Sequence, residues 1–81
     1  MATKHDLSSW LTDALREHDG QASIIEVCKH VWQKHEQDLK SSGDLFYTWQ
    51  YDIRWAATRL RKTGVMRDEK VSPKGVWELN T

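Results

Sequence analysis

Histidine, cysteine and carboxylate side chains are the groups in this 81-residue chain that could carry catalysis or hold a metal. His30 and His35 are five residues apart and fall on different faces of a helix, whereas a metal-binding pair on one helix needs a spacing of three or four. The run from His35 to Leu39 lacks the second histidine that a zinc-binding HExxH motif requires. Cys28 has no second cysteine with which to build a zinc site, and its place on an apolar helix side predicts a buried structural thiol. We therefore expect no enzyme activity, no metal, no cofactor and no small-molecule substrate.

A second set of polar side chains lies in the segment 45–62, whose apolar residues recur at helical spacing. Phe46, Trp49, Ile53 and Leu60 gather on one side at 100° per residue, which predicts the core-facing side. The other side is aromatic, hydroxylic and cationic. Hydroxyl and cationic groups suit phosphate oxygens, and a helix in the major groove reaches base edges with its first half. The residues that we expect to contact DNA are Tyr47, Thr48, Tyr51, Arg54, Thr58, Lys62, Lys70 and Lys74.

Charge is unevenly distributed along a chain whose formal net charge is zero. Residues 1–44 hold five Lys/Arg against eight Asp/Glu, a net charge of −3, and residues 45–75 hold seven against three, a net charge of +4. Such segregation can create one basic face on a neutral protein. It favours double-stranded DNA as the partner.

Trp55 lies near the centre of the polar side of the segment 45–62. A purely solvated face gains nothing from a large ring, so Trp55 either packs on a neighbouring element or contacts a partner, and we expect packing. Exposed Trp and Tyr side chains are enriched in the hot spots of protein interfaces. A protein-interaction module is therefore the alternative function. A homodimer is a further option, because one small DNA-binding module has limited affinity.

Three helices and a hairpin are the elements that would position these side chains. The apolar periodicity predicts helices at about 6–18, 24–39 and 45–62, with Asp6, Ser23 and Asp44 as N-caps, and Thr48 is an alternative start of the third helix. Ser23 and Glu26 have the spacing of a capping box, and Gly20 and Gly64 are placed to end helices.

The hairpin is expected over residues 65–79, with strands Val65–Val71 and Gly75–Leu79 and a short extended piece near Gln21-Ala22. Its lysines, Lys70 and Lys74, either approach the DNA backbone or protect an exposed strand edge. The predicted fold is a single α+β, mainly α domain over residues 1–81. Its layout is a winged helix-turn-helix, with three helices followed by a two-stranded β-hairpin wing.

No apolar run is long enough for a membrane span, and the single cysteine favours a reducing cytoplasmic setting. With Met1 at its start, we expect a small complete protein of bacterial or phage type.

The closing third of the chain resembles a known family. Ile53-Arg54-Trp55-Ala56, Leu60, Gly64-Val65 and Ser72-Pro73-Lys74-Gly75-Val76-Trp77 are similar to the N-terminal winged-helix domain of Mrr-type restriction endonucleases. The likeness covers residues 45–81, and residues 6–40 only by helical pattern. It implies a restriction-associated DNA-binding domain that acts through Arg54, Trp55 and Lys74. The chain has no D…(E/Q)-x-K catalytic core of that enzyme class, so cleavage is not implied.

Overall fold

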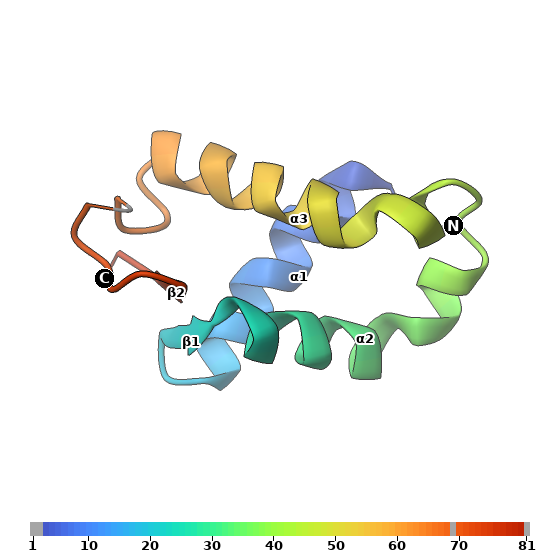
Figure 1. The fold of residues 1–81 in the computed structure, drawn as a ribbon, viewed down its shortest axis with the longest axis horizontal. Helices are drawn as coiled ribbons and strands as arrows, with labels where there is room; N and C mark the ends of the chain where they lie inside the picture. Colours follow the sequence, from blue (N-terminus) through green and yellow to red (C-terminus); the bar gives the residue numbers. More distant parts are fainter. Residues whose placement is uncertain (1–2, 69, 81) are drawn as a thin grey trace.

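The computed structural model describes residues 3–68 and 70–80 and shows three helices with a small antiparallel sheet of two strands at one end (Figure 1). In chain order the elements are α1 (Lys4–Glu17), β1 (Gln21–Ser23), α2 (Ile24–Lys40), α3 (Leu45–Lys62) and β2 (Val76–Glu78). In Figure 1, α1 passes behind α2 and α3. The prediction of a small, mainly helical α+β fold is confirmed. None of the helices in the described part of the chain combines the length and the apolar character that a membrane span needs.

α1 presents the apolar stripe that the sequence predicts. Leu7, Leu11 and Leu15 are completely buried and join the core shared by the three helices. The helix begins two residues earlier than expected, with Thr3 as the N-cap, so the prediction of Asp6 as the cap is wrong. Asp6 instead reaches back, and its carboxylate accepts a hydrogen bond of 2.9 Å from the backbone N–H of Thr3. An acidic residue at this position also interacts favourably with the positive end of the helix dipole.

α2 begins with the predicted capping box. The Ser23 hydroxyl accepts from the Glu26 N–H, and the Glu26 carboxylate accepts from the Ser23 N–H, both at 3.1 Å. The bond from the Ser23 backbone N–H, and after it the Ser23 hydroxyl, stabilise the charged carboxylate and hold the pKa of Glu26 below its ordinary value. The helix ends at Lys40, and its backbone leaves helical geometry at His35. The imidazole of His35 stacks on the ring of Trp10 in α1, with centroids 3.8 Å apart.

α3 has the bounds predicted for the third helix and turns its apolar side to the core. Trp49 and Ile53 are buried there, as expected. The sequence pattern places Phe46 and Leu60 in the core as well, but both are only half-buried. Leu60 still packs against the core from its half-buried position, and the outward side of α3 faces solvent.

The predicted glycines end their helices, but not every predicted N-cap residue caps its helix through its side chain. Gly20 and Gly64 adopt positive φ angles of 94° and 83°, which a residue with a Cβ rarely takes, and they end α1 and α3 as predicted. After Gly64, the Val65 N–H bonds back to the Leu60 carbonyl at 2.9 Å. Asp44 takes the N-cap position of α3, as predicted, but its backbone is helical and its side chain makes no capping hydrogen bond.

β2 pairs along its whole length with β1, and among its described residues the segment 65–71 reaches it only through the first three. The register is Gln21↔Glu78, Ala22↔Trp77 and Ser23↔Val76. The short strand predicted near Gln21-Ala22 is therefore confirmed, whereas the predicted strand Val65–Val71 is too long, because only the first of its described residues pair with the closing strand. Met66 forms an antiparallel bridge with Leu79. On either side of it, the Arg67 N–H donates to the Glu78 carbonyl and the Asn80 N–H donates to the Val65 carbonyl, both at 2.9 Å.

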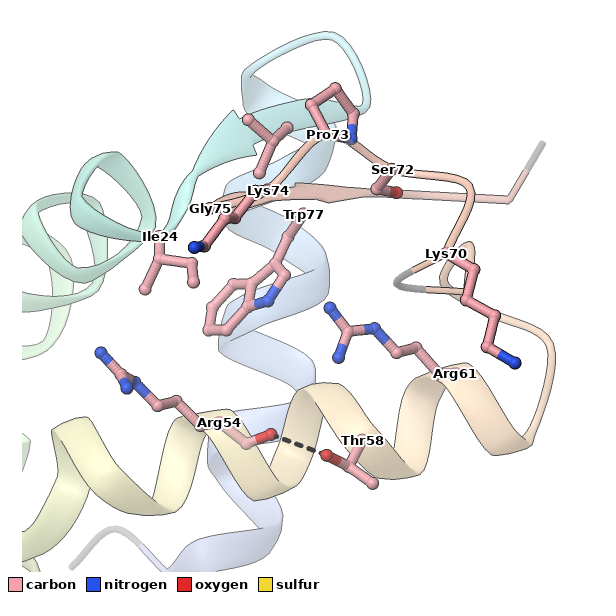
Figure 2. A pocket seen from close by; sticks show the side chains of 11 residues that line it. Ile24, Arg54, Thr58, Arg61, Lys70, Ser72, Pro73, Lys74, Gly75 and Trp77 are labelled. Atoms are coloured by element: carbon pink, nitrogen blue, oxygen red, sulfur yellow. Dashed lines mark hydrogen bonds between the residues drawn. The ribbon is translucent and has the colours of Figure 1, made fainter.

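A turn centred on Asp68 explains why the expected strand does not continue. The Asp68 carboxylate accepts a hydrogen bond of 2.8 Å from the Lys70 N–H. Its backbone carbonyl accepts from the N–H groups of Val71 and Ser72 at 3.0 and 3.2 Å. Asp side chains favour such local turns over strand pairing. The chain therefore bends away from β2, and residues 70–75 form a loop that faces α3 (Figure 2).

Candidate nucleic-acid interface

The outward side of α3 carries a row of exposed aromatic side chains. Tyr47, Tyr51 and Trp55 follow one another at a spacing of four residues and are 82%, 63% and 57% exposed. Residues at this spacing are neighbours on a helix surface. The rings of Tyr51 and Trp55 meet edge to face, with centroids 6.3 Å apart. We call these three residues the aromatic row, and it is open to a macromolecular partner.

Trp55 does not pack on a neighbouring helix or on the hairpin, so that prediction is wrong. More than half of its surface is exposed. It borders a hollow that it shares with Lys4 from α1 and with Arg59 and Lys62 from α3. The predicted strand Val65–Val71, part of the wing on which Trp55 could have packed, is not formed over its full length. The ring therefore stays at the surface.

A groove of about 590 Å³ separates α3 from the 70–75 loop (Figure 2). Arg54 and Arg61 project into it from α3, two helical turns apart, which is roughly 10 Å along the axis. Lys70 and Lys74 border it from the loop. The remaining lining residues are Ile24, Thr58, Ser72, Pro73, Gly75, Val76 and Trp77. We call this feature the cationic groove, and no acidic side chain is among the described residues that line it.

Three charges of the cationic groove are not cancelled by described carboxylates. Within residues 3–68 and 70–80, none of the ion pairs involves Arg54, Lys70 or Lys74. A concave surface lined by charges of one sign raises the local concentration of the opposite ion. The groove is therefore suited to phosphate groups.

Two of the predicted DNA contacts, Thr48 and Thr58, already use their hydroxyl protons inside α3. Thr48 donates to the Asp52 carboxylate at 2.7 Å, and Thr58 donates to the Arg54 carbonyl at 3.2 Å. A hydroxyl has one proton to donate, so in this arrangement both hydroxyls can only accept further hydrogen bonds. Because phosphate oxygens are also acceptors, both residues are less suited to phosphate than expected. Asp52 is itself buried, 3.8 Å from the ammonium group of Lys4.

The eight predicted contacts do not form one cluster. Lys62 lies on the side of α3 that holds Trp55, although it also borders a small hollow beside Arg61 and Asp68. Arg61 is not among the predicted contacts, yet its spacing of seven from Arg54 places both on one helix side, and this signal could have revealed it. The predicted residues that line the cationic groove are Arg54, Thr58, Lys70 and Lys74. Those on the first half of α3 are Tyr47, Thr48 and Tyr51.

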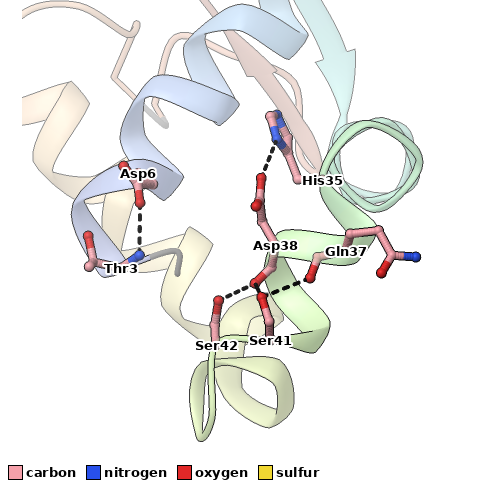
Figure 3. Close-up of polar contacts among 7 residues, drawn as sticks. All are labelled: Thr3, Asp6, His35, Gln37, Asp38, Ser41 and Ser42. Carbon is pink, nitrogen blue, oxygen red and sulfur yellow. Dashed lines mark hydrogen bonds and ion pairs between the residues drawn. The ribbon is translucent and has the colours of Figure 1, made fainter.

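The histidines and the cysteine take part in separate contacts. His30 Nε2 lies 2.6 Å from the Glu17 carboxylate. His35 Nδ1 lies 3.9 Å from the Asp38 carboxylate, near the end of α2 (Figure 3), and burial lowers the pKa of His35. Across residues 3–68 and 70–80, no three His, Cys, Asp or Glu side chains are placed to hold a metal ion. Cys28 is half-buried rather than buried, and burial raises the pKa of its thiol, which makes it a weaker nucleophile at neutral pH.

Comparison with known proteins identifies no relative. No protein-family model matches this chain, and neither does a curated protein or a solved structure. These comparisons therefore supply no function.

Proposed function

We propose that this protein is a non-catalytic module that binds double-stranded DNA. In this proposal the fold is a winged-helix variant, in which α3 is the recognition helix and the 70–75 loop takes the place of the hairpin wing. The cationic groove carries the proposal: two elements contribute four cations to it, and none of its described lining residues is acidic. Duplex DNA carries one negative charge per about 1.7 Å of its axis, so such a groove matches its backbone.

The two parts of the surface have different roles in this proposal. The first half of α3, with Tyr47 and Tyr51, lies in the major groove, where side chains reach base edges. Arg54 stands where the helix meets the cationic groove, within reach of either guanine or phosphate. Lys70 and Lys74 bind phosphates from the loop. The contacts of the loop fix the orientation of the module on DNA, and those of the helix read the sequence.

The resemblance to the winged-helix domain of Mrr-type endonucleases supports the same role. Among the residues that carry the resemblance, Ala56 and Trp77 are buried and serve the core. Arg54 and Lys74 border the cationic groove. A DNA-binding helix and its companion loop need this division, with apolar residues facing inward and cations facing the ligand.

The direct test is an NMR titration of the labelled protein with a short random-sequence duplex, together with fluorescence anisotropy at several salt concentrations. We expect chemical-shift changes on the outward side of α3 and in residues 70–75. With about four phosphate contacts, the affinity should fall about 150-fold between about 50 and about 200 mM salt. An affinity that does not depend on salt, or no binding at low salt, would contradict the proposal.

A protein-interaction role is the second candidate, and the aromatic row favours it. Large exposed aromatic side chains are the residues that most often dominate protein interfaces. The same titration separates the two candidates. Absence of shifts with DNA at low salt would support the protein-interaction role, and measurement of the mass in solution would show whether the partner is a second copy.

A further inference from the structure

A second groove, of about 560 Å³, lies between α2 and the first half of α3, which Figure 1 shows running side by side in front of α1. We call it the apolar groove. Its lining residues are Ile24, Ile25, Cys28, Lys29, Trp32, Phe46, Trp49, Gln50 and Arg54. Its aromatic residues come from the core-facing side of α3 and from α2, so it is distinct from the aromatic row. A volume of this size suits two or three apolar side chains.

Aromatic rings form the wall of the apolar groove. Trp32 of α2 stacks on Trp49 of α3 with centroids 6.3 Å apart and an interplanar angle of 9°. Phe46 lies 6.3 Å from Trp32 on the same side. Trp32 and Phe46 are only half-buried, and Ile25 at the edge is 68% exposed. The groove thus leaves apolar surface in water that a docked apolar side chain would cover.

The charges around the apolar groove restrict the kind of partner. Lys29 and Arg54 border it, and none of the described residues that line it is acidic. A symmetric pair of copies meeting through this face would bring these cations together, because a twofold interface uses the same patch on both partners. A second copy is therefore disfavoured, and an acidic partner is favoured.

We propose that the apolar groove binds an amphipathic, acidic helix of another protein. Apolar side chains on one side of that helix, at spacing i, i+3 or i+4 and i+7, enter the groove between α2 and α3. Carboxylates on its flanks meet Lys29 and Arg54. The two grooves share Ile24 and Arg54, but Ile25 and Lys29 lie outside the cationic groove, so variants at these two positions test the partner site separately from the proposed DNA-binding function.

The test uses a synthetic helical peptide of about four turns, with leucines on one side and glutamates on the flanks. The control peptide has lysine in place of each glutamate. Binding is followed by fluorescence anisotropy of the labelled peptide and by the alkylation rate of Cys28, the single cysteine of the chain, with iodoacetamide. We expect the acidic peptide to bind at least about tenfold more tightly than the lysine peptide and, at saturation, to slow alkylation of Cys28 about tenfold.

Two variants with matched controls place the peptide in the groove. Ile25→Ser should weaken the acidic peptide about tenfold, whereas Val71→Ser, at a similarly exposed residue of the 70–75 loop, should leave it unchanged. Lys29→Glu should shift the preference toward the lysine peptide, and Lys34→Glu, at an exposed residue of α2 outside the groove, should not. Circular dichroism checks that each variant is folded.

Three results would overturn this inference. The first is equal affinity for the two peptides, and the second is no binding of the acidic peptide at millimolar concentration. The third is binding that leaves the alkylation of Cys28 unprotected, which would place the peptide elsewhere. Duplex binding measured on the same samples is a separate readout, so failure of the peptide site and failure of the DNA-binding proposal are distinguishable.

Discussion

Replacement of Arg54 by alanine gives the sharpest test of the cationic groove. Arg54 is exposed on α3 and borders the groove, and the hydrogen bond from Thr58 goes to its backbone carbonyl, which the substitution retains. Alanine is also the best helix former. The variant should therefore keep its fold and lose one cation that faces the DNA.

The expected magnitude follows from counterion release. About four phosphate contacts, among them those of Arg54, Lys70 and Lys74, predict a slope of about −3.6 for the logarithm of the binding constant against the logarithm of the salt concentration. Three contacts predict a slope of about −2.7. Between about 50 and about 200 mM salt, the wild type should then weaken about 150-fold and Arg54→Ala about 40-fold. The ratio of the wild-type binding constant to that of Arg54→Ala should therefore fall about 3.5-fold over this range.

The assay is fluorescence anisotropy with one random-sequence duplex at four or more salt concentrations. Lys74→Ala should change the slope by the same amount, because its ammonium borders the same groove from the loop. Arg16→Ala is the matched control: Arg16 is exposed on α1, 3.7 Å from Asp13, and does not border the groove. Unchanged slopes in both Arg54→Ala and Lys74→Ala, or an equal change in Arg16→Ala, would refute the assignment of the groove to DNA phosphates.

Two further predictions concern stability. Trp55→Ala should lower the free energy of unfolding by less than about 1 kcal/mol because the ring is exposed, whereas Trp49→Ala, at a buried ring, should lower it by about 3–5 kcal/mol. Urea unfolding measures both values, and equal losses in the two variants would contradict this prediction. The pKa of Glu26 is lowered in the folded state by its hydrogen bonds to Ser23. The charged carboxylate therefore stabilises the folded state above the ordinary pKa of a glutamate, and this stabilisation is lost as the pH falls through the lowered pKa. Urea midpoints of Glu26→Gln should therefore depend less on acidic pH than those of the wild type, and parallel profiles would contradict this.

Much of the helical part of the fold could be predicted from local patterns. The bounds of α3, the capping box of Ser23 and Glu26 and the helix-ending Gly64 all follow from the sequence. Each depends on residues within a few positions of one another. The exposed side of α3 follows from the same periodicity, so most candidate contacts on that helix could be proposed from the order of its residues.

The first strand of the wing could not be predicted in the same way. Val65–Val71 has strand-like composition, but the turn that begins at Asp68 removes the chain from the ladder after Arg67. β2 pairs instead with β1, more than fifty positions earlier in the chain. Pairing between strands depends on which edge the packed helices leave available, and composition does not record this.

The sequence by itself determined the helices, most of their ends, the core stripe of each helix and the cationic character of the closing segment, because these features arise from neighbours along the chain. The tertiary structure alone decided that Trp55 stays exposed and that Arg54 and Arg61 face Lys70 and Lys74 across one groove. It also decided that α2 and α3 leave an apolar groove between them. The physical reason is that burial and charge proximity depend on how distant segments pack together.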